Sequence, residues 1–144
     1  MSPFTHILIL IDCSPSDGAI MDLVEKLLEG STTKVTLSHV VHSHTLDQDR
    51  ALKEQADACM ESMLERFRAL GAGPVNKLLL SGEPEEELEK AINQGDYDLV
   101  AMGTHGHTGF EDLLYGSVSR YLKHKITVPL LMVRNTETTA EKTH

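Results

Sequence analysis

The sequence predicts a three-layer α/β sandwich in which helices cover both faces of a parallel β-sheet. Short apolar runs rich in Ile, Val and Leu alternate along the chain with longer segments in which apolar residues follow helical spacing. The first run, HILILI at residues 6–11, is apolar throughout after its histidine, which is typical of a strand buried on both faces. Strands that alternate with helices imply right-handed crossovers and therefore a parallel sheet.

The first strand and helix occupy residues 6–30. After the strand, residues 12–17 (DCSPSD) supply turn and N-cap chemistry for a helix. Gly30 is a suitable residue to end this helix. Its apolar stripe, which we expect to face the sheet, consists of Ile20, Val24, Leu27 and Leu28.

The same criteria predict four more strands and three more helices. Gly71 and Gly95 end the second and third helices, and three consecutive glutamates at 85–87 suit the positive end of the third helix's dipole. The predicted elements are, in chain order, a strand at 34–41, a helix at 52–70, a strand at 75–80, a helix at 85–93, a strand at 97–102, a helix at 117–124 and a strand at 128–133.

Length and charge limit the possible classes of protein. A chain of 144 residues has room for one globular domain, which we expect at 1–134, followed by a polar, disordered tail at 135–144. Asp and Glu number 22 against 13 Lys and Arg, and a net charge of −9 argues against nucleic acid as a partner. The longest apolar runs fall short of the roughly 18 residues that span a bilayer, and the start lacks the basic region of a signal peptide. We therefore expect a cytoplasmic protein with no membrane partner.

The two cysteines lie far apart in the sequence and form no Cys-x-x-Cys pair, so we expect no disulfide. Cys59 falls on the apolar stripe of the long helix and is expected in the core. Cys13 is expected to be a small, partly buried side chain; a redox-responsive thiol beside a helix N-terminus is the alternative.

A glycine-rich segment follows the fourth predicted strand. Gly103, Gly106 and Gly109 allow backbone N–H groups to approach an anion, and Gly116 with Ser117 opens a helix whose N-terminus favours phosphate. The spacing Gly-x2-Gly-x9-Gly-Ser is neither a P-loop nor the usual dinucleotide fingerprint. Because such glycines also serve tight turns and a serine also caps helices, the pattern alone leaves both interpretations open.

The segments DLVAMGTHGHTG at 98–109, YGSVS at 115–119 and VPLLMV at 128–133 resemble the universal stress protein family. With the first strand and its following aspartate included, the resemblance extends over residues 6–134. It implies a Rossmann-like fold of the adenine nucleotide alpha-hydrolase-like type, with a five-stranded parallel sheet of order 3-2-1-4-5. The family's ATP-binding members share this glycine spacing, so the resemblance implies that ATP or another adenine nucleotide binds, together with Mg²⁺ or Mn²⁺ carried by its phosphates.

The resemblance also gives each expected binding residue a role. Asp12 would contact the adenosine, the Val40 backbone would contact the adenine edge, and Gly106 would leave room for ribose and phosphates. Met102 and Gly103 would line the site. The terminal phosphates would be held by Gly116, Ser117, Val118 and Ser119.

Two residues depart from the family pattern and leave other functions open. His107 stands where a basic residue is frequent and Cys13 where glycine is common, so nucleotide affinity can be lower than in strong binders. One alternative is therefore an interaction module of the same fold that is independent of nucleotide, and a slow ATPase is another. Because the loop contains no lysine or arginine to stabilise phosphoryl transfer, we expect no catalytic residues and at most slow ATP hydrolysis.

The histidines do not follow the spacing of a structural zinc site, so we expect no resident metal. Those near the predicted sheet edge are His39, His42, His44, His105 and His107.

The apolar last strand, Pro129 to Val133, would leave an unpaired edge that antiparallel pairing of two copies would cover. The expected protein is a stress-response homodimer that acts as a nucleotide-dependent sensor or adaptor for an unidentified protein partner.

Overall fold

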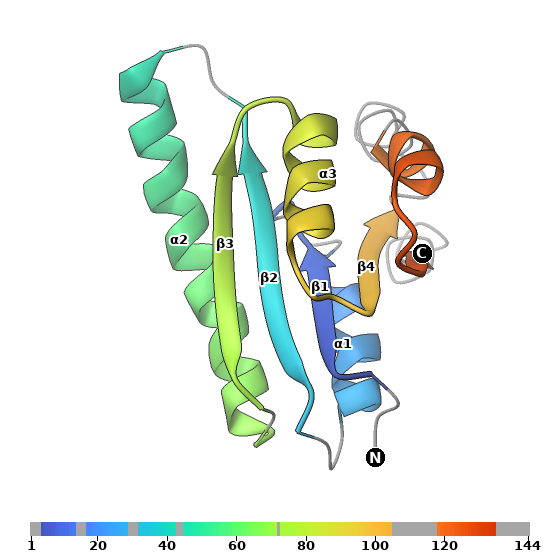
Figure 1. Ribbon diagram of the computed structural model, residues 1–144. Coiled ribbons are helices and arrows are strands. Elements are labelled where there is room, and N and C mark those ends of the chain that lie inside the picture. Colours follow the sequence, from blue (N-terminus) through green and yellow to red (C-terminus); the bar gives the residue numbers. More distant parts are fainter. Residues whose placement is uncertain are drawn as a thin grey trace, which may run out of the picture.

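The computed structural model describes residues 4–13, 17–28, 32–42, 45–71, 73–104 and 118–134. Within these ranges, five parallel strands form one sheet in the order β3-β2-β1-β4-β5, which confirms the predicted fold class and strand order (Figure 1). The strands are β1 (His6–Leu10), β2 (Lys34–Val41), β3 (Val75–Ser81), β4 (Leu99–Thr104) and β5 (Leu130–Arg134). The helices are α1 (Asp17–Leu28), α2 (Leu46–Ala69), α3 (Pro84–Gln94) and an unlabelled helix at 118–125.

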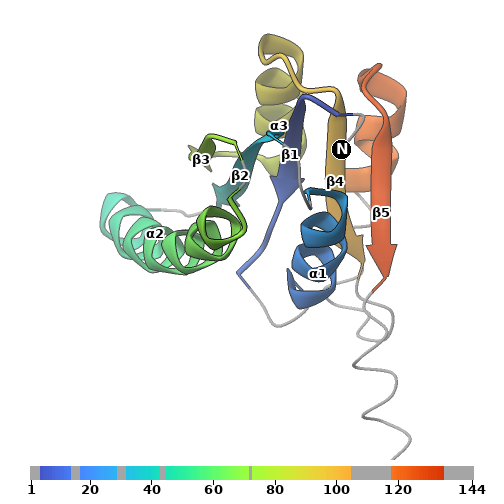
Figure 2. The ribbon, with the colours of Figure 1, turned by 90° about the horizontal axis from the view of Figure 1, so that it is seen from below.

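Helices cover both faces of the sheet. Figure 2 shows α1 and α2 on one face and α3 with the helix at 118–125 on the other. A hydrophobic core lies on each face of the sheet, and side chains of β1 point alternately into the two. Ile7 and Ile9 pack in the core that includes α1 and α2, and Leu8 and Leu10 pack in the core that includes α3. All five residues of β1 are buried, which explains why this run is apolar on both faces.

The ends of several elements differ from the sequence prediction. The largest difference is at α2, which begins at Leu46 instead of residue 52, because Thr45 caps it by accepting a hydrogen bond from the Gln48 N–H at 3.0 Å. After α2, Gly71 has φ +75°, the left-handed conformation expected of a helix-ending glycine. Gly95 also ends its helix, but its φ is negative, and here a Cβ would overlap the ring of Tyr97. Gly95 is thus required by packing.

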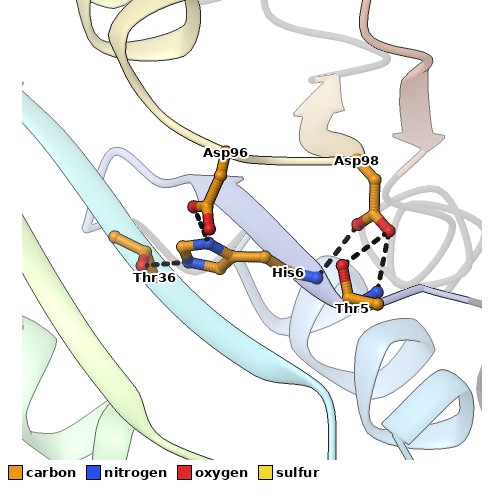
Figure 3. Close-up of polar contacts among 5 residues, drawn as sticks. All are labelled: Thr5, His6, Thr36, Asp96 and Asp98. Atoms are coloured by element: carbon orange, nitrogen blue, oxygen red, sulfur yellow. Dashed lines mark hydrogen bonds and ion pairs between the residues drawn. The ribbon is translucent and has the colours of Figure 1, made fainter.

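A polar network joins the amino ends of β1 and β4 (Figure 3). The Asp98 carboxylate accepts from the Thr5 N–H at 2.8 Å, the Thr5 hydroxyl at 3.1 Å and the His6 N–H at 3.0 Å. The buried His6 ring contacts Asp96 Oδ1 through Nδ1 at 2.7 Å and Thr36 Oγ1 through Nε2 at 2.8 Å. These contacts hold the central strands together at the edge opposite their carboxyl ends.

Two further expectations concern membrane-spanning helices and the C-terminal tail. In the described part of the chain, no helix has the length and apolar character that crossing a membrane requires. The expected tail at 135–144 lies outside the described residues.

Candidate functional site

The candidate site lies at the carboxyl ends of the central strands. β1 pairs with β2 on one side and β4 on the other, so the strand order reverses at β1, and parallel sheets bind ligands at such a reversal. A small cavity of about 70 Å³ opens there between the sheet, α3 and the helix at 118–125. Its lining residues are Leu10, Ile11, Asp12, Ser38, His39, Val40, Pro84, Leu88, Met102 and Val118.

Four of the residues predicted from the sequence meet in this cavity: Asp12, Val40, Met102 and Val118. Asp12 is half-buried two residues after β1, Met102 is fully buried in β4, and Val118 is buried in the helix at 118–125. The last bond from β1 to β2 runs from the Ile11 N–H to the Ser38 carbonyl at 2.9 Å. The backbone of Val40, two residues further along β2, points to the same side, where β1 has ended and the cavity begins.

A larger cavity of about 410 Å³ adjoins the first one on the side of α2. The two cavities share Asp12, His39 and Val40, so we describe them together as one crevice. The larger cavity falls in the size range of small-molecule sites. It is also lined by Cys13, Val41, His42, Leu52, Gln55, Ala56 and Cys59.

The helices that border the small cavity are joined by a polar contact. The Tyr121 hydroxyl, on the helix at 118–125, donates to Glu89 Oε1 of α3 at 2.5 Å. This hydrogen bond raises the pKa of Tyr121 to about 12. The contact holds the start of the helix at 118–125, with Val118, beside Leu88 of α3 in the same core.

The structure separates the remaining predicted residues from the cavity or does not describe them. Gly103 is absent from the cavity lining, and a Cβ on it would lie 2.9 Å from Ile20 Cδ1 of α1, on the other face of the sheet. Gly103 therefore lies close to the Ile20 side chain of α1. Ser119 lies in the helix at 118–125, outside the lining of the cavity. The predicted binding residues Gly106, Gly116 and Ser117 lie outside the described residues.

Two carboxyl groups control the charge at the end of β1. Asp17, the first residue of α1, accepts from the Cys13 N–H at 2.8 Å and from the Asp12 N–H at 3.3 Å. Burial raises the pKa of Asp17 to about 8, and the adjacent Asp12 carboxylate, which repels a second negative charge, adds to the shift. Asp17 thus keeps its proton at neutral pH, while the more exposed Asp12 faces the crevice.

Sequence reasoning considered His39 only as a metal ligand. Its Nδ1 lies 2.9 Å from the Ile11 carbonyl, which can only accept, so Nδ1 carries the proton and donates. The ring lines both parts of the crevice. Pro84 and Leu88 also line the small cavity but were not predicted to do so. Only the packing of α3 on the sheet, in which Leu88 is buried, brings them to the site.

The disulfide expectation was wrong. Cys13 and Cys59 are bonded, with Cα atoms 6.1 Å apart. Both residues are half-buried, and Cys59 lies beside the core instead of within it. Distance along the sequence gave no sign of this pairing, because it is the packing of α2 against the sheet that brings the middle of α2 to the end of β1.

Within the described ranges, no three His, Cys, Asp or Glu side chains gather in a way that could hold a metal ion. Of the histidines considered, His44, His105 and His107 lie outside these ranges.

Comparison with known proteins gives several matches. Universal stress protein MJ0577 of Methanocaldococcus jannaschii is 31% identical over 83 residues, which are 58% of this chain and 51% of that protein, so the match spans about half of the relative. Universal stress protein YxiE of Bacillus subtilis is 23% identical over 148 residues, covering 91% of this chain and 99% of the relative.

The fold also matches solved structures. The structure of MJ0577 has a TM-score of 0.75 at 26% identity and covers 90% of this chain and 95% of its own. A universal stress protein in complex with cAMP has a TM-score of 0.68 at 19% identity, and the match covers 92% of this chain and 98% of that chain. An Arabidopsis thaliana family member with AMP bound has a TM-score of 0.67 at 15% identity, and the match covers 91% of this chain and 92% of that chain. Because the model of the universal stress protein family matches residues 3–134, nearly the whole chain, this protein belongs to that family.

Proposed function

We propose that this protein binds an adenine nucleotide, ATP or AMP among them, in the crevice and acts as a nucleotide-dependent regulator. The observation that carries the proposal is the meeting of Asp12, Val40, Met102 and Val118 around one cavity at the reversal of strand order. Solved family members of the same fold hold cAMP and AMP, which supports an adenine ligand.

The lining suits the parts of a nucleotide. The apolar side chains of Leu10, Leu88 and Met102 offer a surface for a flat base, and the Val40 backbone offers hydrogen-bonding groups at its edge. The Asp12 carboxyl group can accept from ribose hydroxyls. The phosphates would lie at the amino end of the helix that contains residues 118–125, because the first N–H groups of a helix lack intrahelical partners.

We also propose that two copies pair through β5. β5 is an edge strand of the sheet, and Met132 on it is 39% exposed, a large apolar side chain at an edge that a second copy would cover. Antiparallel pairing about a two-fold axis would extend the sheet across both copies.

A calorimetric titration of nucleotide-free protein with AMP and with ATP tests the binding proposal. We expect one site per chain, and we expect Asp12→Ala to weaken binding by about 10- to 100-fold, the loss of a hydrogen bond to a charged group. Asp47→Ala is the matched control, because Asp47 is an exposed carboxylate outside the crevice lining.

Gly106→Val distinguishes the two classes of function that the sequence left open. Under the proposal, the added side chain blocks the phosphates, so nucleotide binding is lost while the fold is kept. Wild-type protein that binds neither AMP nor ATP would contradict the proposal and favour the nucleotide-independent interaction module.

A further inference from the structure

The bond between Cys13 and Cys59 crosses the wall of the crevice. Cys13 follows Asp12 at the end of β1, and Cys59 lies in the middle of α2. Both residues are half-buried and line the larger cavity together with Asp12 and His39. A small reductant or oxidant can therefore reach the sulfur atoms through the same opening that a ligand would use.

Cys13 has a backbone conformation that its residue type disfavours. Its φ is +60°, in the left-handed region, and within the described ranges it is the one residue other than glycine with a positive φ. A Cβ in this region crowds the neighbouring carbonyl, so glycine is the usual choice. The crosslink to α2 holds Cys13 in this conformation, and its N–H then reaches Asp17 at 2.8 Å.

The two ends of the crosslink are anchored to different degrees. α2 is held on the sheet by Met60, Leu64 and Phe67, which are at most 1% exposed, and this packing does not depend on the disulfide. Within the described residues, Cys13 is held by the disulfide, by a hydrogen bond from its N–H to Asp17 and by partial packing against the core. When the disulfide opens, α2 stays in place and the turn after β1 is free to leave the left-handed conformation.

We propose that the Cys13–Cys59 pair is a thiol–disulfide switch that sets the nucleotide affinity of the crevice, tight when oxidised and weaker when reduced. This inference rests on the proposed function, because it concerns the same site. The turn that the disulfide holds positions Asp12, which is the carboxylate we assign to the ribose. Reduction lets Cys13 leave this conformation, so the adjacent Asp12, which keeps its hydrogen bond to Asp17, is held less firmly for the ligand.

The chemistry is a two-electron exchange. A dithiol reductant attacks one sulfur atom to form a mixed disulfide, the other cysteine leaves as a thiolate and takes up a proton, and the second thiol of the reductant releases the first cysteine. In the reverse direction, one cysteine thiol gives up its proton and attacks hydrogen peroxide as the thiolate, which forms a sulfenic acid, and the leaving hydroxide takes up that proton as one water. The other thiol then displaces the sulfenic hydroxyl as a second water, and the disulfide forms.

The experiment compares AMP affinity by calorimetry for peroxide-oxidised and dithiothreitol-reduced protein, with each reagent removed or matched in the buffer. A thiol titration should find both of the chain's 2 cysteines free after reduction and neither free after oxidation. We expect reduction to raise the Kd for AMP at least about fivefold, the low end of measured couplings between sites.

Two variants separate the crosslink from a general effect of reductant. Cys59→Ala removes the bond and leaves Cys13 in place, so it should bind weakly under both conditions. Cys13→Gly combined with Cys59→Ala should bind tightly under both, because glycine adopts the left-handed turn without a crosslink.

Each contrary result identifies what fails. Equal AMP affinity of the oxidised and reduced wild type would overturn the switch and leave the proposed function standing. Absence of AMP binding in both states would overturn both proposals. Thiols that stay free after peroxide treatment, or a double variant as weak as Cys59→Ala, would also overturn the switch.

Discussion

Replacing Asp17 by asparagine should remove a dependence of stability on pH. Asp17 is 3% exposed at the start of α1, and its carboxyl oxygens accept from the N–H groups of Asp12 and Cys13. Burial raises its pKa to about 8 from an ordinary 3.8, and Asp12 adds to the shift. Asparagine keeps one acceptor oxygen and cannot ionise, so it is the closest uncharged replacement.

The sign of the pH dependence of stability follows from which state, folded or unfolded, keeps the Asp17 proton. Above about pH 4 the unfolded chain releases the Asp17 proton, whereas the folded chain keeps it up to about pH 8. The free energy of unfolding is therefore highest at low pH and falls as the pH rises toward 8. The slope is about 1.4 kcal/mol per pH unit, so the wild type should lose about 2 to 3 kcal/mol between about pH 6 and pH 9.

Urea unfolding followed by circular dichroism at several pH values measures this loss. The protein is kept oxidised, so that cysteine titration does not contribute. Titrations of groups other than Asp12, which interacts with Asp17, are common to both proteins and cancel in the difference between wild type and Asp17→Asn. Parallel pH profiles for the two proteins would refute the reasoning, and so would a wild type that gains stability over the variant as the pH rises.

Two further predictions concern the edge and the amino end of the sheet. Met132→Lys should yield folded monomers in analytical ultracentrifugation, because the side chain is already 39% exposed; an unchanged dimer mass would exclude β5 pairing. Asp98→Ala should cost about 2 to 3 kcal/mol in urea unfolding, because three hydrogen bonds from Thr5 and His6 are lost, and Asp98→Asn should cost less. Partial burial alone would raise the pKa of Asp98, but these bonds hold it below its ordinary value, so their contribution should decline as acid protonates it.

The fold could be predicted from the sequence because its signals are local. The run at 6–11 is apolar on both faces, and the central position of β1 requires this. The start of α2 was missed because its first turns are polar: Leu46 is 85% exposed, and the helix begins there through the Thr45 cap, without apolar spacing. Apolar periodicity predicts where a helix is buried and does not predict where it begins.

The candidate site was predicted in part, and the misses have a common cause. Asp12 follows the first predicted strand and Met102 ends the strand predicted at 97–102, so the parallel-sheet rule places them at the crevice without knowledge of the packing. The Cys13–Cys59 bond and the lining by Leu88 depend on how helices dock, which no local pattern encodes. Gly103 was assigned to the ligand from the resemblance alone, and the structure adds that the Ile20 side chain of α1 lies close to it.

Amide chemical-shift mapping of isotope-labelled, nucleotide-free protein titrated with AMP tests the central claim most directly. The account predicts saturable shifts concentrated at the carboxyl ends of β1, β2 and β4, with Asp12, Val40 and Met102 among the largest, and with the Asp98 network at the opposite edge unaffected. Shifts centred elsewhere, or none at saturating AMP, would contradict it.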